Sequence, residues 1–148
     1  MKRIVISLAV FAAALATAGL AIAAGHPSKV NLHKTKAGKL LVTSNGFTLY
    51  EFAKDTKNTD NCFAHANCRT VWPPLITSGK PVAGKGVKGS MLGTITLPNH
   101  RQQVTYGGWP LYKYIGDGKP GAVSGVGIFQ AGGRWYGVTA AGHRVSKK

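Results

Sequence analysis

Acidic side chains are scarce in this 148-residue sequence, in which four Asp and Glu residues stand against 19 Lys and Arg residues. A glycoside hydrolase needs two carboxyl groups at a set separation, with further polar groups to tune them. Two of the four acids, Asp55 and Asp117, fall at equivalent places after equivalent strands, but no neighbouring His or third acid supports that pair, so the sequence argues against such an enzyme. The formal net charge of +15 favours an anionic partner, which we expect to be an anionic envelope component or an acidic protein.

A sustained helical period is also missing beyond the first 23 residues, where no segment repeats apolar side chains every 3.6 residues. This lack excludes a helical domain. The chain instead alternates short β-type runs with turn residues, and most of its 20 glycines fall at those turns. Cysteine is scarce as well. No Cys follows Ala23, so a lipid-anchored mature end is not encoded at that position.

Residues 1–23 have the layout of a secretory signal peptide. Lys2 and Arg3 precede an apolar run over residues 4–20, and residues 21–23 form a small-x-small cleavage site. The alternative is an uncleaved membrane anchor, because residues 4–24 are long enough to cross a bilayer. We expect cleavage and a periplasmic or secreted protein with no remaining transmembrane segment. Export argues against nucleic acid as the partner.

A β-hairpin is duplicated in the chain, at residues 40–55 and again at 102–117. Six positions recur 62 residues later, where Val42, Thr43, Gly46, Leu49, Tyr50 and Asp55 match Val104, Thr105, Gly108, Leu111, Tyr112 and Asp117. Asn45-Gly46 predicts a two-residue type I′ turn in the first copy, and Gly107-Gly108 occupies the same place in the second.

Alternation along these strands assigns their faces. The face expected in the core carries Val42, Phe47, Leu49, Val104, Tyr106, Trp109 and Leu111. The opposite face is aromatic and semi-polar, and we expect loops to cover it or leave it partly exposed. The prediction is an all-β fold of antiparallel sheet or sheets, built from two related hairpin repeats as a small sandwich or partly closed barrel. Residues 24–38 are expected to form a flexible basic leader, and residues 39–148 a single β domain.

The segments at residues 49–55 and 111–117 resemble the secreted-repeat family of predicted bacterial lipoproteins, which is defined by a Tyr-x-aromatic-x-x-Asp motif. The resemblance continues through Cys62, Cys68, Trp72-Pro73-Pro74-Leu75 and Trp135-Tyr136. It implies an envelope-associated β-protein of undefined activity, of a kind sometimes found beside electron-transfer or stress components. The chain departs from the family in lacking the lipid-attachment Cys and in spacing its two cysteines more widely.

The motif residues are the first candidates for a site. They are Tyr50, Phe52 and Asp55 in one copy and Tyr112, Tyr114 and Asp117 in the other. One interpretation is structural, with each Asp accepting backbone N–H groups at a turn while the rings pack. The other is a ligand groove, in which aromatic rings bind a sugar or ring and the Asp accepts its hydroxyls. Trp72, followed by two prolines, is expected to be a packing wedge or part of a recognition surface.

Cys62, His65 and Cys68 form a Cys-x-x-His-x-x-Cys segment. Outside the cytoplasm such a close cysteine pair indicates a disulfide. The alternatives are a thiolate–imidazole site for copper or zinc and a reducible disulfide that serves electron transfer.

Cleavage after Ala23 would create a second candidate metal site at the mature N-terminus. The free amine of Ala24, two amide nitrogens and the imidazole of His26 could surround Cu(II) in one plane, with Gly25 between them. From all these features we expect an exported, non-enzymatic envelope protein that binds an anionic or metal-bearing partner. The alternative is an accessory protein in periplasmic redox or copper handling.

Overall fold

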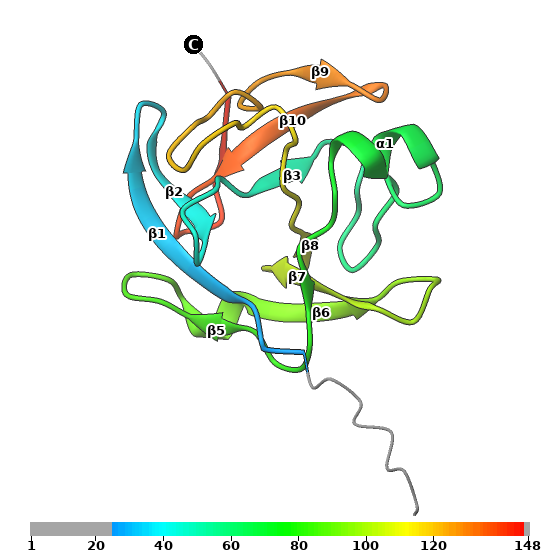
Figure 1. The fold of residues 1–148 in the computed structure, drawn as a ribbon, viewed down its shortest axis with the longest axis horizontal. Coiled ribbons are helices and arrows are strands. Elements are labelled where there is room, and N and C mark those ends of the chain that lie inside the picture. The colour runs from blue at the N-terminus through cyan, green and yellow to red at the C-terminus, as the bar shows by residue number, and fades with distance from the viewer. Residues whose placement is uncertain (1–24, 147–148) are drawn as a thin grey trace, which may run out of the picture.

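The computed structural model describes residues 25–146 as an all-β fold, which confirms the predicted class (Figure 1). The predicted signal peptide and Ala24 lie outside the described residues. In chain order the elements are β1 Lys29–Thr35, β2 Gly38–Thr43, β3 Tyr50–Phe52, α1 Ala66–Val71, β4 Ile76–Thr77, β5 Val82–Ala83, the 3₁₀ turn η1 Gly89–Met91, β6 Leu92–Thr96, β7 Gln102–Tyr106, β8 Trp109–Pro110, β9 Phe129–Gln130, β10 Gly133–Val138 and β11 Arg144–Val145.

Three small sheets surround a common core. Their strand orders are β2-β1-β5, then β11-β10-β3 with β9 added on β10, and β4-β7-β6 with β8 added on β7. All pairings are antiparallel except that of β1 with β5. None of these sheets closes on itself within residues 25–146, and no helix in that range is long and apolar enough to cross a membrane.

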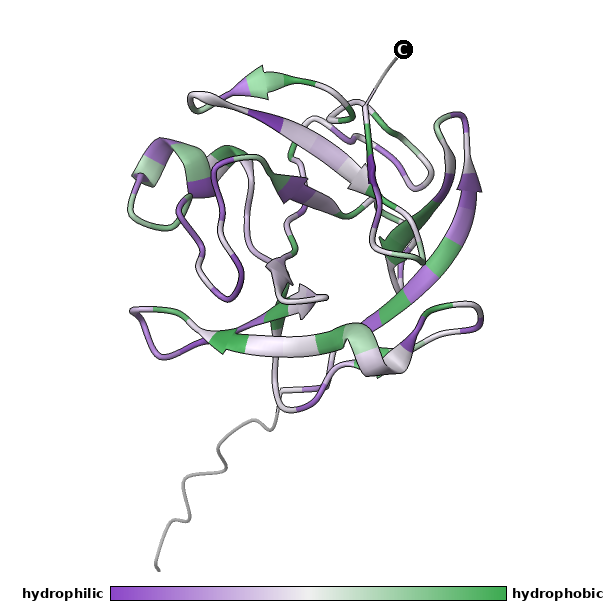
Figure 2. Cartoon of the chain, turned by 180° about the vertical axis from the view of Figure 1, so that it is seen from behind, coloured by the Kyte–Doolittle hydropathy of each residue, from purple (hydrophilic) through white to green (hydrophobic). Residues whose placement is uncertain are grey.

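The prediction of a flexible leader over residues 24–38 is wrong from residue 29 onward. β1 pairs with β2 through six residue pairs from Val30↔Thr43 to Thr35↔Gly38. Figure 2 shows hydrophilic and hydrophobic residues alternating along β1. Only Val30 and Leu32 supply its apolar face, and Val30 is fully buried. Two apolar residues among two lysines, an asparagine, a histidine and a threonine give a weak strand pattern, which explains the error.

The first repeat turns differently from the expected type I′ geometry. Gly46 has a φ of 84°, but Asn45 is not among the residues with positive φ. Gly46 N donates to Thr43 O, and Thr43 N donates to Phe47 O. This is a three-residue turn that ends in a glycine bulge. The second repeat has the two-residue turn, with φ of 58° at Gly107 and 84° at Gly108.

Both faces of the repeat strands are mostly buried. Of the two alternatives predicted for the aromatic face, covering by loops or partial exposure, partial exposure is therefore wrong for most of its residues. Leu41 of β2 enters an aliphatic core with Leu49, Val104 and Leu111. Leu40 enters an aromatic core whose large members are Tyr50, Phe52, Trp72, Tyr112 and Trp135. Phe47 and Trp109, which were expected in the core, are only half-buried. The short helix α1 begins at Ala66 and ends immediately before Trp72.

Candidate functional site

The two repeats meet at their equivalent tyrosines, Tyr50 and Tyr112, in the centre of the aromatic core. Tyr50 N donates to Tyr112 O and Tyr112 N donates to Tyr50 O, each at 2.9 Å. The segments that flank this antiparallel bridge are also equivalent. Gly137 pairs with Tyr50, and Pro74 pairs with Tyr112. The copies therefore face each other reciprocally, in the manner of a two-fold interface.

Each tyrosine binds the aspartate of the other repeat. Tyr50 Oη donates to Asp117 Oδ2 at 2.5 Å, and Tyr112 Oη donates to Asp55 Oδ2 at 2.8 Å. Both tyrosines are fully buried. The hydrogen bonds thus cross between the copies, and each motif is completed by the other.

The second oxygen of each aspartate holds the loop that follows it. Asp55 Oδ1 accepts the backbone N–H of Asn61 at 2.8 Å, and Asp117 Oδ1 accepts that of Ser124 at 2.9 Å. These contacts confirm that the aspartates accept backbone N–H groups at turns. They add a partner that the sequence interpretation did not include, which is the opposite tyrosine.

The aromatic rings form a continuous stack between the repeats. Trp72 and Trp135 lie parallel with ring centroids 3.9 Å apart. Tyr114 stacks on the free face of Trp72 at 4.1 Å, and Phe52 stacks on Trp135 at 4.3 Å. The stack order is therefore Phe52, Trp135, Trp72 and Tyr114, with rings from the two copies alternating about the central pair. Both indoles also donate to Gln130, Trp72 to Oε1 at 2.9 Å and Trp135 to the backbone oxygen at 3.2 Å.

Burial is the main cause of the pKa shifts of Tyr50, Asp55 and Tyr112. Desolvation raises the pKa of Asp55 to about 7, although the Asn61 N–H and the Tyr112 hydroxyl both act to lower it. Desolvation also raises the pKa of Tyr50 and of Tyr112, and a neighbouring aspartate adds to it in each case. Both tyrosines therefore stay protonated and act as hydrogen-bond donors.

The interpretation of these residues as an open ligand groove is not supported by their positions. Tyr50, Phe52, Asp55, Trp72, Tyr112 and Asp117 are all buried, and Tyr114 is half-buried against Trp72. The hydroxyls of Tyr50 and Tyr112 and the carboxylates of Asp55 and Asp117 bind one another or the backbone. The Trp72 indole N–H donates to the side chain of Gln130. The structure brings the predicted site residues together, but as the scaffold that joins the repeats.

The cysteines form the predicted disulfide. Cys62 and Cys68 are linked at an S–S distance of 2.08 Å, and residues 25–146 contain no free cysteine. His65 is exposed between them. The bond consumes both thiols, so the thiolate–imidazole metal site is not formed. Within the described residues no cluster of three His, Cys, Asp or Glu side chains could hold a metal. His26 and Gly25 are exposed, and the Cu(II) site with Ala24 stays a prediction because Ala24 is outside the described range.

An ion pair that the sequence did not reveal joins β3 to β11. Arg144 Nε donates to Glu51 Oε2 at 2.8 Å, and Glu51 is only 1% exposed. Arg144 also lies over the rings of Trp109 and Tyr136, at 4.4 and 5.2 Å from the ring centroids. Burial raises the pKa of Glu51, while Arg144 opposes that effect. The signal that could have identified this pair is the scarcity of acids, because a strand-borne Glu flanked by aromatics needs a cation.

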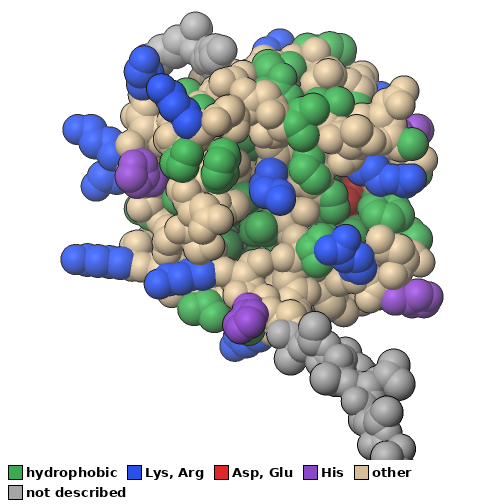
Figure 3. Space-filling view, viewed as in Figure 1, with side chains coloured by type: hydrophobic (Ala, Val, Ile, Leu, Met, Phe, Trp, Pro, Cys, Tyr) green, Lys and Arg blue, Asp and Glu red, His purple; other side chains and the backbone are tan. Residues whose placement is uncertain are grey.

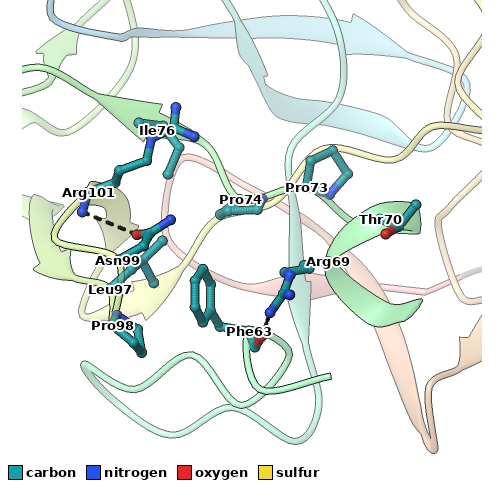
Figure 4. A pocket seen from close by; sticks show the side chains of 10 residues that line it. All are labelled: Phe63, Arg69, Thr70, Pro73, Pro74, Ile76, Leu97, Pro98, Asn99 and Arg101. Carbon is teal, nitrogen blue, oxygen red and sulfur yellow. Dashed lines mark hydrogen bonds between the residues drawn. The ribbon is translucent and has the colours of Figure 1, made fainter. Parts of the chain in front are cut away.

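Two hollows adjoin the segment that follows Trp72, and Figure 4 shows the first of them. Two adjoining cavities, of about 680 and 590 Å³, share Pro73, Pro74, Ile76 and Arg101 in their walls. The first is completed by side chains that include Phe63 and Arg69, and the second by side chains that include Phe47 and Lys113. We call this pair of cavities the proline groove. The groove leaves no signal in the sequence, because its residues come from several separate segments.

Comparison with known proteins agrees with the internal duplication. A family model described as a secreted repeat of unknown function matches the chain twice, over residues 32–76 and 93–139. Each match contains one copy of the hairpin together with the tryptophan of the central stack. The match confirms the family resemblance predicted from the sequence. No curated protein and no solved structure gives a match to the chain.

Proposed function

The chain belongs to the family described as a secreted repeat of unknown function, and on that premise we propose that it is a non-enzymatic envelope protein that binds an anionic partner. The family description and the Cys62–Cys68 disulfide both support a location outside the cytoplasm. The proposal is carried by one observation, which is how the fold distributes charge between its core and its surface.

The few acidic side chains are withdrawn from the surface. Glu51, Asp55 and Asp117 are 1%, 4% and 5% exposed. The fourth, Asp60, is half-buried and accepts the backbone N–H of Phe63 at 2.7 Å. In residues 25–146 every Lys and Arg except Arg144 is exposed. Figure 3 shows one face of the molecule, with Lys and Arg side chains projecting around it and almost no acidic surface.

This arrangement makes the exterior more positive than the net charge alone requires. A surface of one sign attracts polyanions over distances up to the Debye length, which is about 8 Å at physiological ionic strength. Surface carboxylates would normally interrupt such a field with short ion pairs. In this protein the carboxylates of Asp55 and Asp117 are buried and join the two repeats, so the surface cations remain free for a partner.

The same distribution supports a binding role over a catalytic one. The carboxyl groups best suited to acid–base chemistry are enclosed with hydrogen-bond partners, away from both cavities of the proline groove. We carry forward no second function, since no observation in the described residues favours the metal-bearing partner or the redox alternative.

The experiment is equilibrium binding of the purified protein to anionic and neutral surfaces across a salt series. Suitable probes are polygalacturonate, dextran sulfate and phosphatidylglycerol vesicles, with pullulan and phosphatidylcholine vesicles as neutral controls. We expect binding to at least one anionic probe that weakens steeply between about 0.05 and 0.5 M salt, because the Debye length shrinks over that range. Equal binding to neutral probes, or no binding to any anionic probe, would overturn the proposal.

A further inference from the structure

We infer that the proline groove is a binding site for an acidic polysaccharide, whose sugar rings pack on its apolar walls while its anionic groups meet Arg69, Arg101 and Lys113. This inference rests on the proposed function and assigns it to one place on the surface.

The groove exists because the two repeats differ at one edge. In the second repeat β10 lies between β3 and β11, so that Gly137 pairs with Tyr50 on one side and Val145 on the other. In the first repeat Pro74 takes the place of Gly137 and pairs with Tyr112. The adjoining strand β4 stands at the end of its sheet, with no counterpart of β11 in the described chain. The edge that β11 covers in one copy carries no paired strand in the described part of the other, where Ser28 donates to Ile76 O and Thr77 Oγ1.

The prolines decide which class of partner fits this open edge. An extended peptide recognises a sheet edge mainly through backbone hydrogen bonds. Pro73 and Pro74 have no N–H to donate, so the edge is poor for strand addition. Recognition there must use side chains, and the available side chains are rings, aliphatic groups, cations and a few uncharged polar groups.

The walls of the groove are matched to a chain that is both cyclic and charged. Phe63 and Pro74 offer flat apolar faces toward the cavity in Figure 4, and Arg69 and Arg101 lie at its two sides. Lys113 extends the cationic lining into the second cavity. No Asp or Glu lines either cavity. Guanidinium groups bind the anionic groups of sugars with paired hydrogen bonds, which suits a uronate carboxylate.

The Cys62–Cys68 disulfide fixes one wall of the proline groove. Phe63 and Arg69 directly follow Cys62 and Cys68 in the sequence, and the bond holds the Cα atoms of the two cysteines 5.4 Å apart, so the next residues also start close together. Arg69 Nη1 donates to Phe63 O at 2.6 Å, and its guanidinium lies 5.1 Å from the Phe63 ring centroid. This wall is therefore organised before a ligand arrives, which lowers the entropy cost of binding.

The test compares two triple variants that lose the same charge. The groove variant carries Arg69→Gln, Arg101→Gln and Lys113→Gln. The control carries Lys34→Gln, Lys39→Gln and Lys85→Gln, at exposed positions that line neither cavity. At about 0.15 M salt we expect the groove variant to lose roughly tenfold or more in affinity for polygalacturonate and the control roughly threefold or less, since direct charge-assisted contacts exceed the screened field.

A second pair of variants leaves the charge unchanged. Phe63→Ala removes an apolar wall of the groove, whereas Phe129→Ala removes a phenylalanine that is 68% exposed on β9. We expect weaker binding of polygalacturonate for Phe63→Ala only, with the near-UV circular dichroism of both variants unchanged. Dextran sulfate serves as the second probe, to distinguish sulfate from carboxylate recognition.

The outcomes separate the two proposals. Equal losses in both triple variants, together with unchanged binding by Phe63→Ala, would overturn the groove while leaving a general polyanion-binding function in place. Failure of the unmodified protein to bind any anionic probe would overturn the proposed function and the groove with it.

Discussion

Tyr50 donates its phenol proton to Asp117, 67 residues further along the chain, and not to Asp55 of its own motif. Tyr112 does the same in reverse and donates to Asp55. The spacing within the motif therefore places each tyrosine to bind the aspartate of the other repeat. A single copy would leave its tyrosine and aspartate without buried partners, which explains why two copies form one core.

The first prediction concerns the cost of removing one of these donors. Tyr112→Phe deletes a single oxygen and leaves Asp55 Oδ2 buried without that donor, so we expect a loss of about 1–3 kcal/mol in the free energy of unfolding. Tyr50→Phe should cost at least as much, because its hydroxyl also accepts the N–H of Gly125. Urea unfolding measures both. Tyr136→Phe, at a half-buried ring outside the two pairs, is the control, and an equal loss there would contradict the account.

The second prediction is a stability that falls as pH rises. Unfolded Asp55 releases its proton near pH 3.8, whereas the folded protein holds it until about pH 7. The unfolded state therefore binds fewer protons in this window, and the free energy of unfolding declines with rising pH. The gap corresponds to about 4 kcal/mol at most. Glu51 and Asp60, whose pKa values burial also raises, add to the same trend.

Asp55→Asn isolates the contribution of Asp55. The amide can still accept the N–H of Asn61 and pair with Tyr112, but it cannot ionise. Unfolding in urea at several pH values between about 4 and 8 should show a flatter profile for this variant. An identical slope in both proteins would show that Asp55 does not titrate in this range.

The third prediction concerns the stacked indoles. Trp72 and Trp135 are parallel at 3.9 Å, so their transitions should couple and give a strong near-UV circular dichroism signal. Trp72→Phe and Trp135→Phe should each abolish that signal. Trp109→Phe should retain it, because Trp109 lies against Arg144 instead. A signal that survives in either of the first two variants would show that the rings are not stacked as described.

The fourth prediction concerns the disulfide. Its ring is small, with a sequence separation of 6 residues, so the restriction of the unfolded chain contributes only about 2 kcal/mol. The double variant Cys62→Ser and Cys68→Ser should therefore fold but melt at a lower temperature. In the unmodified protein, thiol titration under native conditions should detect no free thiol, and reactive thiols after export would refute the structural assignment.

Much of the fold could be predicted from the sequence because its strongest signals are local. The turn glycines at 46 and 108 and the recurring Val-Thr and Leu-Tyr pairs identified the repeat and its strands. The disulfide followed from two close cysteines in an exported chain. These features depend on residues within a few positions of each other.

The parts that could not be predicted depend on contacts between the copies. Asp55 is closer in sequence to Tyr50 than to Tyr112, and both assignments fit the same motif. Trp72 and Trp135 lie 63 residues apart with different neighbours, so their equivalence is visible only from their stacking in the folded core. β1 was missed because its pairing with β2 supplies what its polar sequence lacks.

A double-mutant cycle measures most directly whether each tyrosine binds the aspartate of the other repeat. The unfolding free energies of Tyr50→Phe, Asp117→Asn and the double variant give the coupling between those two side chains, and a parallel cycle pairs Tyr50→Phe with Asp55→Asn. We predict a coupling of about 1 kcal/mol or more for Tyr50 with Asp117 and close to zero for Tyr50 with Asp55. Strong coupling within the motif and none between the repeats would contradict the account.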